Sequence, residues 1–133
     1  FDTEVQKKIA DAGVEPETRT ALVTLSKRLP LYLNSATPVT ALTQTVEMLG
    51  VRDCFKGILG RPENKVENLT DVARAERANP SEILFVGDSE SDYKTAESFG
   101  CRFLGLANES NAWGSKNPPF TTIATLAEIE EHL

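Results

Sequence analysis

One run of four apolar residues, Ile83-Leu84-Phe85-Val86, most constrains what this chain can fold into. The run does not alternate with polar residues, which indicates a strand covered on both faces, as in a parallel sheet with helices on either side. Gly87 and Asp88 follow the run directly. Because such folds bind ligands beyond the carboxyl ends of their strands, Asp88 is a candidate functional residue.

Strand-like and helical segments alternate along the rest of the chain. Apolar spacing predicts helices at 2–12, from Pro16 to Pro30, from Thr37-Pro38 to Gly50, at 66–73, before Gly100 and from Leu126 to the end. Further strands are predicted at 31–33, 55–59, 101–106 and 120–123. This order predicts an α/β fold, a three-layer doubly wound parallel sheet with a Rossmann-like core.

Charge and composition exclude several functions. The 133 residues include 14 Lys or Arg and 20 Asp or Glu, a net charge of −6, which argues against nucleic acid as a partner. No apolar run approaches the ~20 residues that span a membrane, so we expect no membrane association. The one histidine, His132, argues against histidine-based catalysis. We expect Cys54 and Cys101 to be reduced thiols and the protein to be cytoplasmic.

Two predicted loops carry groups that suit phosphate. The first, 34–37, offers hydroxyls and a helix start, although Thr37 is more simply a helix cap and Ser35 a turn residue. The second, 60–65, places Arg61 and Lys65 beyond a strand. Lysine can neutralise phosphate charge, although a solvated surface lysine is the commoner outcome. Taken singly, neither loop identifies a site.

The third loop, Gly87-Asp88-Ser89-Glu90-Ser91-Asp92, is acidic. Acids at a helix start are stabilised by the helix dipole, which is the simpler explanation. Carboxylates gathered beyond a buried strand also form the oxygen site that Mg²⁺ prefers. We favour the metal site because a single glycine separates Asp88 from a wholly apolar strand.

The three loops together carry more information than any one of them. A hydroxyl, a lysine and Gly-Asp-x-x-x-Asp, each after its own strand, resemble the haloacid dehalogenase-like (HAD) hydrolase superfamily, most of whose members are Mg²⁺-dependent phosphatases. The resemblance extends roughly from Pro16 to the C-terminus. It implies catalytic roles for Ser35 and Lys65, phosphate binding by Ser35, Ala36 and Lys65, with Asn34 as an alternative register to Ser35, and Mg²⁺ binding by Asp88 and Asp92.

The first motif of that superfamily, Asp-x-Asp-Gly-Thr after an N-terminal strand, is absent from the 133 residues. Its first Asp is the nucleophile and its second the general acid and base. Phe1-Asp2-Thr3-Glu4-Val5 is a superficial candidate, but Glu4 replaces the second Asp and no Gly-Thr follows. We therefore expect the chain to be the carboxyl-terminal core of a phosphatase, truncated and inactive by itself.

The resemblance also implies how the chain is organised. Residues 1–15 would be a remnant of a cap or linker helix, and residues 16–133 a partial core domain. Little room for a cap exists between Ser35 and Lys65, so a large cap would precede Pro16, as in the phosphoglycolate phosphatase and β-phosphoglucomutase branch. The superfamily's first strand lies between the strands at 31–33 and 83–86. Its absence would expose two edges, so we expect dimerisation, strand swapping or poor solubility.

Two other interpretations are open. A degenerate HAD-like binding module would keep the scaffold and lack the chemistry, and the coding sequence upstream of Phe1 would distinguish it from a fragment. A phosphorelay receiver domain also has an acidic Mg²⁺ site, but it needs acids after its first and third strands. The corresponding ends here carry Asn34-Ser35 and Gly60-Arg61. We therefore expect a phosphatase core whose partner is a small phosphorylated metabolite.

Overall fold

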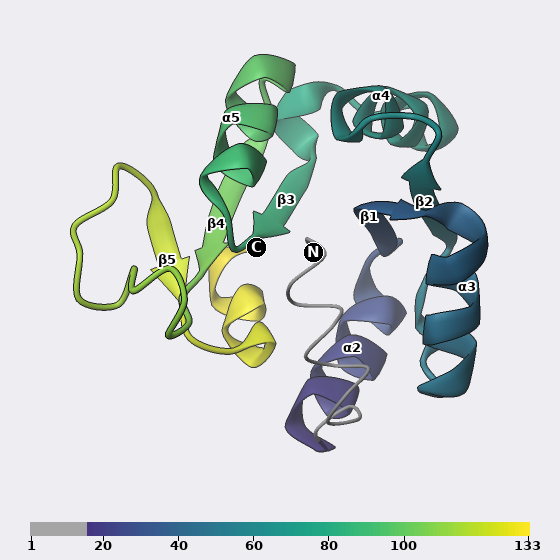
Figure 1. Ribbon diagram of the computed structural model, residues 1–133, viewed down its shortest axis with the longest axis horizontal. Helices are drawn as coiled ribbons and strands as arrows, with labels where there is room; N and C mark the ends of the chain where they lie inside the picture. Colours follow the sequence, from purple (N-terminus) through teal and green to yellow (C-terminus); the bar gives the residue numbers. More distant parts are fainter. Residues whose placement is uncertain (1–15) are drawn as a thin grey trace.

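The computed structural model describes residues 16–133 (Figure 1). The elements in chain order are α2 (Pro16–Arg28), β1 (Tyr32–Pro38), α3 (Val39–Met48), η1 (Arg52–Cys54), β2 (Gly57–Arg61), α4 (Lys65–Glu76), η2 (Pro80–Glu82), β3 (Leu84–Gly87), α5 (Glu90–Phe99), β4 (Arg102–Leu106), β5 (Thr121–Ile123) and η3 (Leu126–His132). The predicted helix at 2–12 and the predicted segment 1–15 lie outside the described residues. Within the described part, no helix has both the length and the apolar character needed to cross a membrane.

The strands pair in parallel, as predicted. β1 pairs with β2, with Leu33 opposite Ile58, while β3 pairs with β4 and β4 with β5. These pairs form two sheets, β1-β2 and β3-β4-β5, and no ladder joins β1 to β3 within residues 16–133 (Figure 1). The gap predicted between these two strands is therefore present in the described part of the chain.

Two apolar clusters show that helices cover both faces of the strands. Successive strand residues point to opposite faces, so neighbours on one strand enter different clusters. Leu84, Val86 and Leu104 pack in the larger cluster, to which α2, α3 and η3 contribute. Phe85 and Phe103 pack in the smaller cluster with residues of α4 and α5. This arrangement confirms the predicted three-layer α/β fold.

The segment after the first strand differs from its prediction. The sequence predicts a loop at 34–37 with Thr37 as the helix cap, but β1 continues to Pro38. Pro38 is the N-cap of α3, and no side chain caps this helix start. Asn34 and Ser35 therefore lie within a strand, where both are buried. The backbone of β1, not a flexible loop, fixes their positions.

Smaller differences occur at two other elements. The second strand begins two residues later than predicted, because Phe55 ends the short helix η1 by donating its N–H to the carbonyl of Arg52. The last segment is a 3₁₀-helix. Leu126 and Ile129 are buried as predicted, but Leu133 is 45% exposed, so the predicted apolar face of this segment is shorter.

A largely apolar cavity of about 380 Å³ lies between the two sheets. Side chains from β1 and β3 line it, and helices α2 and α4 together with η3 supply the remaining walls. Leu22 and Leu25 of α2 and Leu69 of α4 are among its lining residues. The two strands that are not joined by a ladder therefore share one apolar space.

A buried aromatic cluster anchors the loop after β4. Trp113 is 4% exposed, and its ring centroid lies 4.8 Å from that of Phe120 and 6.5 Å from that of Phe103. Gly105 of β4 makes room for this packing, since a Cβ there would lie 2.5 Å from Phe120 and 2.9 Å from Trp113. Trp113 is thus a packing residue that fastens the loop to the sheet.

Both cysteines, Cys54 and Cys101, are free thiols, as expected. Burial raises the pKa of Cys54, and it raises the pKa of Cys101 to about 11. A thiol with a raised pKa stays protonated at neutral pH and is a poor nucleophile. These two residues therefore act as small core side chains.

Replacing Gly105 by alanine should destabilise the protein. The new methyl group would press on the rings of Phe120 and Trp113, and overpacking of this kind costs about 1–3 kcal/mol. Urea unfolding followed by Trp113 fluorescence measures the change. The matched control is Gly114→Ala in the same loop, because nothing lies within 4 Å of its added Cβ. Equal unfolding midpoints for the two variants would contradict the packing role of Gly105.

Candidate active site

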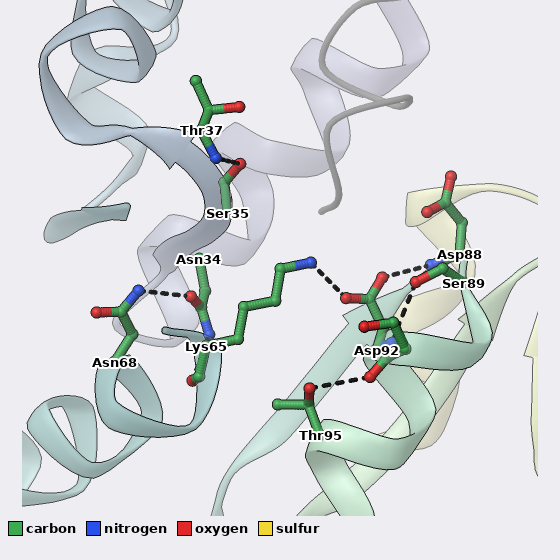
Figure 2. A network of polar contacts seen from close by, with 10 residues as sticks. Asn34, Ser35, Thr37, Lys65, Asn68, Asp88, Ser89, Asp92 and Thr95 are labelled. Atoms are coloured by element: carbon green, nitrogen blue, oxygen red, sulfur yellow. Dashed lines mark hydrogen bonds and ion pairs between the residues drawn. The ribbon is translucent and has the colours of Figure 1, made fainter. Parts of the chain in front are cut away.

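A buried ion pair joins the helix that follows β2 to the helix that follows β3. Lys65 is the first residue of α4, and its Nζ lies 2.5 Å from Oδ1 of Asp92, which is on α5. The Lys65 side chain is 11% exposed and the Asp92 side chain is fully buried. Figure 2 shows Lys65 extending from the side of β1 and α4 toward the acids after β3. Arg61, the other cation of its predicted loop, is exposed.

The start of α4 is built to hold Lys65 in place. Asn64 caps the helix by accepting a hydrogen bond from the N–H of Glu67, and the Glu67 carboxylate accepts one from the N–H of Asn64. This reciprocal capping box fixes the first helical turn. The carbonyl of Lys65 also accepts a hydrogen bond of 3.0 Å from the side chain of Asn34 on β1.

Asn34 and Asn68 form a buried amide pair behind Lys65. Nδ2 of Asn68 donates to Oδ1 of Asn34 at 2.9 Å, and the two residues are 1% and 5% exposed. These bonds satisfy groups that would otherwise be costly to bury. Asn34 therefore faces α4 and supports Lys65. The sequence motifs did not predict a role for Asn68. A signal that could have revealed it is its position directly before Leu69, which belongs to the apolar stripe of a predicted helix.

The acidic loop after β3 is folded around Asp92. The N–H of Asp88 donates to Oδ2 of Asp92 at 3.2 Å, and Ser89 caps α5 by accepting from the N–H of Asp92. A Cβ on Gly87 would lie 2.5 Å from the Asp92 carboxylate, so this position requires glycine. The Gly-Asp-x-x-x-Asp spacing therefore brings the backbone of Asp88 against the second acid.

Asp88 is 7% exposed and is also held from the loop after β4. Asn108 donates to its carboxylate at 3.1 Å, and Asn111 donates to its backbone carbonyl at 2.9 Å. The sequence motifs did not predict a role for these two asparagines. Their loop is rich in residues that form turns, but sequence alone does not show that it folds back onto β3.

The predicted phosphate-binding residues lie at the end of β1. Ser35 is fully buried, and its Oγ accepts a hydrogen bond of 3.0 Å from the N–H of Thr37. Ala36, the next residue, is exposed. Figure 2 shows Ser35 on the same side as Asn34 and Lys65, across from Asp88. The structure thus joins Lys65, Asp88 and Asp92 by direct contacts, and the binding roles of Ser35 and Ala36 stay predictions.

The acids offer a partial donor set for Mg²⁺. Within residues 16–133, no group of three or more His, Cys, Asp or Glu side chains is placed to hold a metal ion. Mg²⁺ usually takes one or two protein carboxylates, with waters and substrate phosphate as the remaining ligands. Both oxygens of Asp92 already accept hydrogen bonds, from Lys65 and from the N–H of Asp88. The set therefore fits a site in which Asp88 is the principal ligand, and metal binding by either acid stays a prediction.

Comparison with known proteins identifies the family. A family model described as haloacid dehalogenase-like hydrolase matches residues 3–100. The chain belongs to this family. The resemblance seen in the sequence is confirmed at the level of the family.

Curated relatives of this HAD-like chain include two phosphoglycolate phosphatases. The protein from Cereibacter sphaeroides is 38% identical over 69 residues, which are 50% of this chain and 32% of that protein. The protein from Escherichia coli K12 is 33% identical over 86 residues, which are 61% of this chain and 34% of that protein. The matched segments thus span about a third of these relatives.

Solved structures of the family share the fold. A HAD-superfamily hydrolase of subfamily IA from Geobacter sulfurreducens superimposes with a TM-score of 0.75 at 26% identity, over 90% of this chain and 61% of that one. A predicted phosphoglycolate phosphatase from Haemophilus somnus gives a TM-score of 0.75 at 25% identity, over 88% and 56%. The HAD-like chain therefore corresponds to little more than half of either structure.

Replacing Asn68 by alanine should destabilise the protein by about 1–3 kcal/mol, because it leaves the buried amide oxygen of Asn34 without its donor. Urea denaturation measures the loss. Combining it with Asn34→Ala should cost less than the sum of the two single changes, since the residues are in contact. Additive effects would contradict the pairing. The control is Asn117→Ala at an exposed position, which should change stability by no more than about 0.5 kcal/mol.

Proposed function

We propose that this chain forms the carboxyl-terminal core of a Mg²⁺-dependent phosphomonoester hydrolase. The observation that carries the proposal is the contact of 2.5 Å between Lys65 and the fully buried Asp92, beside Asp88. Membership of a hydrolase family supports it, as do relatives named as phosphatases. A buried cation next to two acids at the carboxyl ends of parallel strands suits recognition of a phosphate with its metal.

Each side chain would have a distinct task at this site. Lys65 would offset phosphate charge as a point cation, and Asp92 would hold its ammonium group in place. The Ser35 hydroxyl and the backbone N–H of Ala36 would donate hydrogen bonds to phosphate oxygens. Asp88 would be the principal metal ligand. Bound Mg²⁺ would supply neutralisation of the charge on the transferring phosphoryl group.

The covalent step needs a nucleophile that this sequence does not contain in the family's motif. No Asp-x-Asp-Gly-Thr occurs among the 133 residues. Positioning and charge stabilisation cannot replace a group that must form the aspartyl-phosphate. We therefore propose that this chain alone is inactive, and that a segment outside these 133 residues supplies the nucleophile.

The substrate would be a small phosphorylated metabolite. Two curated relatives are named phosphoglycolate phosphatase, which makes 2-phosphoglycolate the first compound to test. A net charge of −6 disfavours a polyanionic partner and fits a site where one lysine supplies the local positive charge. With its protonated thiols, the protein would work in the cytoplasm.

Calorimetric titration of the chain with Mg²⁺ in the presence of inorganic phosphate tests the site. Weak binding is expected for the wild type and none for Asp88→Ala, because that change removes the principal ligand. Glu90→Gln, an exposed acid in the same loop, is the matched control and should bind as the wild type does. Equal binding by wild type and Asp88→Ala would show that the acidic loop only caps α5.

A turnover assay with 2-phosphoglycolate accompanies the titration and should give no hydrolysis above background. Robust Mg²⁺-dependent turnover abolished by Asp88→Asn would contradict the proposed inactivity. If the coding sequence instead starts just before Phe1, a non-catalytic HAD-like binding module becomes the better assignment.

We also propose that two copies of the chain exchange an extended segment across the apolar cavity. The cavity of about 380 Å³ is lined by both β1 and β3, so a strand from a second copy would join the two sheets. Sedimentation velocity at micromolar concentration should show a dimer or larger species. A stable monomer that remains in solution over the same range would contradict this proposal.

A further inference from the structure

A closed turn directly after β4 is held by two asparagines. The N–H of Asn108 donates to Oδ1 of Asn111 at 3.0 Å, and the N–H of Asn111 donates to Oδ1 of Asn108 at 2.8 Å. The N–H of Ala112 donates to the carbonyl of Asn108 at 2.9 Å. With both amide oxygens engaged inside the turn, both amide NH₂ groups are left to point outward from it.

Both NH₂ groups reach the same residue, Asp88. Nδ2 of Asn108 donates to Oδ2 of Asp88 at 3.1 Å, and Nδ2 of Asn111 donates to the carbonyl of Asp88 at 2.9 Å. Nδ2 of Asn111 also donates to the carbonyl of Leu106, the last residue of β4, at 2.9 Å. One turn therefore fixes the side chain and the backbone of Asp88 relative to the neighbouring strand.

Trp113 anchors this turn. The backbone N–H of Trp113 donates to Oδ1 of Asn111 at 3.0 Å, and the Trp113 ring is buried against Phe120 over Gly105. A hydrogen bond thus ties the turn to Trp113, and aromatic packing ties Trp113 to the sheet. A carboxylate that is already held in place binds a metal ion more tightly, because a loosely held carboxylate loses rotational freedom when it binds.

We propose that Asn108 is a positioning residue for Asp88, setting the affinity of the acidic site for its divalent cation. This inference rests on the proposed function of Asp88 as the principal metal ligand. A neutral amide suits the task, because it orients one carboxylate oxygen without cancelling the negative charge that attracts the cation. A lysine or arginine in its place would compete with the metal for the same carboxylate.

The test is a Mn²⁺ titration of the full chain, followed by water-proton relaxation, in wild type and Asn108→Ser. Serine keeps a hydroxyl that can accept from the N–H of Asn111, but it is too short to reach Asp88. We expect the Mn²⁺ affinity to fall about tenfold or more, as for other groups that support metal ligands. Trp113 emission should stay at its wild-type value, while the lost hydrogen bond to buried Asp88 lowers the unfolding midpoint. Asn117→Ala, an exposed asparagine in the same loop, should leave the affinity unchanged.

The remaining outcomes decide the matter. Wild-type affinity in Asn108→Ser, with binding lost in Asp88→Ala, would overturn the role of Asn108 and leave the metal site standing. Failure of the wild type to bind Mn²⁺ at millimolar concentration would overturn both the role of Asn108 and the proposed metal site at Asp88. A loss of affinity in Asn108→Ser that comes with Trp113 emission like that of the unfolded chain would show that the turn acts through folding alone, which also overturns the inference.

Discussion

The buried ion pair between Lys65 and Asp92 is the interaction on which the rest of the site depends. It spans the two sheets, since Lys65 begins the helix after β2 and Asp92 lies in the helix after β3. A charge taken out of water must be compensated, so each partner constrains where the other can lie. Gly87 serves the same pair, because only a glycine lets the Asp92 carboxylate approach the backbone of β3.

Neutral amides support the charged groups from both sides. Asn34 holds the carbonyl of Lys65 and is itself held by Asn68, and Asn108 and Asn111 hold Asp88. An amide can both donate and accept, so a chain of amides satisfies buried polar groups without adding charge. In the function we propose, the charges of the lysine and the acids would then act on a phosphate and its cation. The amides thus stabilise the fold, and the charged groups carry the chemistry that we propose.

Much of the fold and part of the site followed from local sequence. The run Ile83-Leu84-Phe85-Val86 predicted β3, and the glycine and acids after it predicted the loop that enters α5, because burial on both faces leaves little choice of element. The bounds of β1 were less predictable. Thr37-Pro38 is typical of a helix start, yet β1 pairs with β2 again at Pro38, opposite Arg61, after an irregularity that follows Asn34. Long-range pairing decided between two local preferences that the sequence alone could not rank.

The amino-acid sequence determined the α/β class, the family and the residue types at the ends of the strands, since apolar periodicity and short motifs are local properties. Tertiary structure alone decided which of those residues meet. Lys65 contacts Asp92 across 27 positions of the chain, and Asn108 contacts Asp88 across 20. Such contacts depend on how parallel strands bring their carboxyl ends together and on how a loop anchored by Trp113 folds back. No local sequence pattern predicts that geometry, because it arises from the packing of the whole domain.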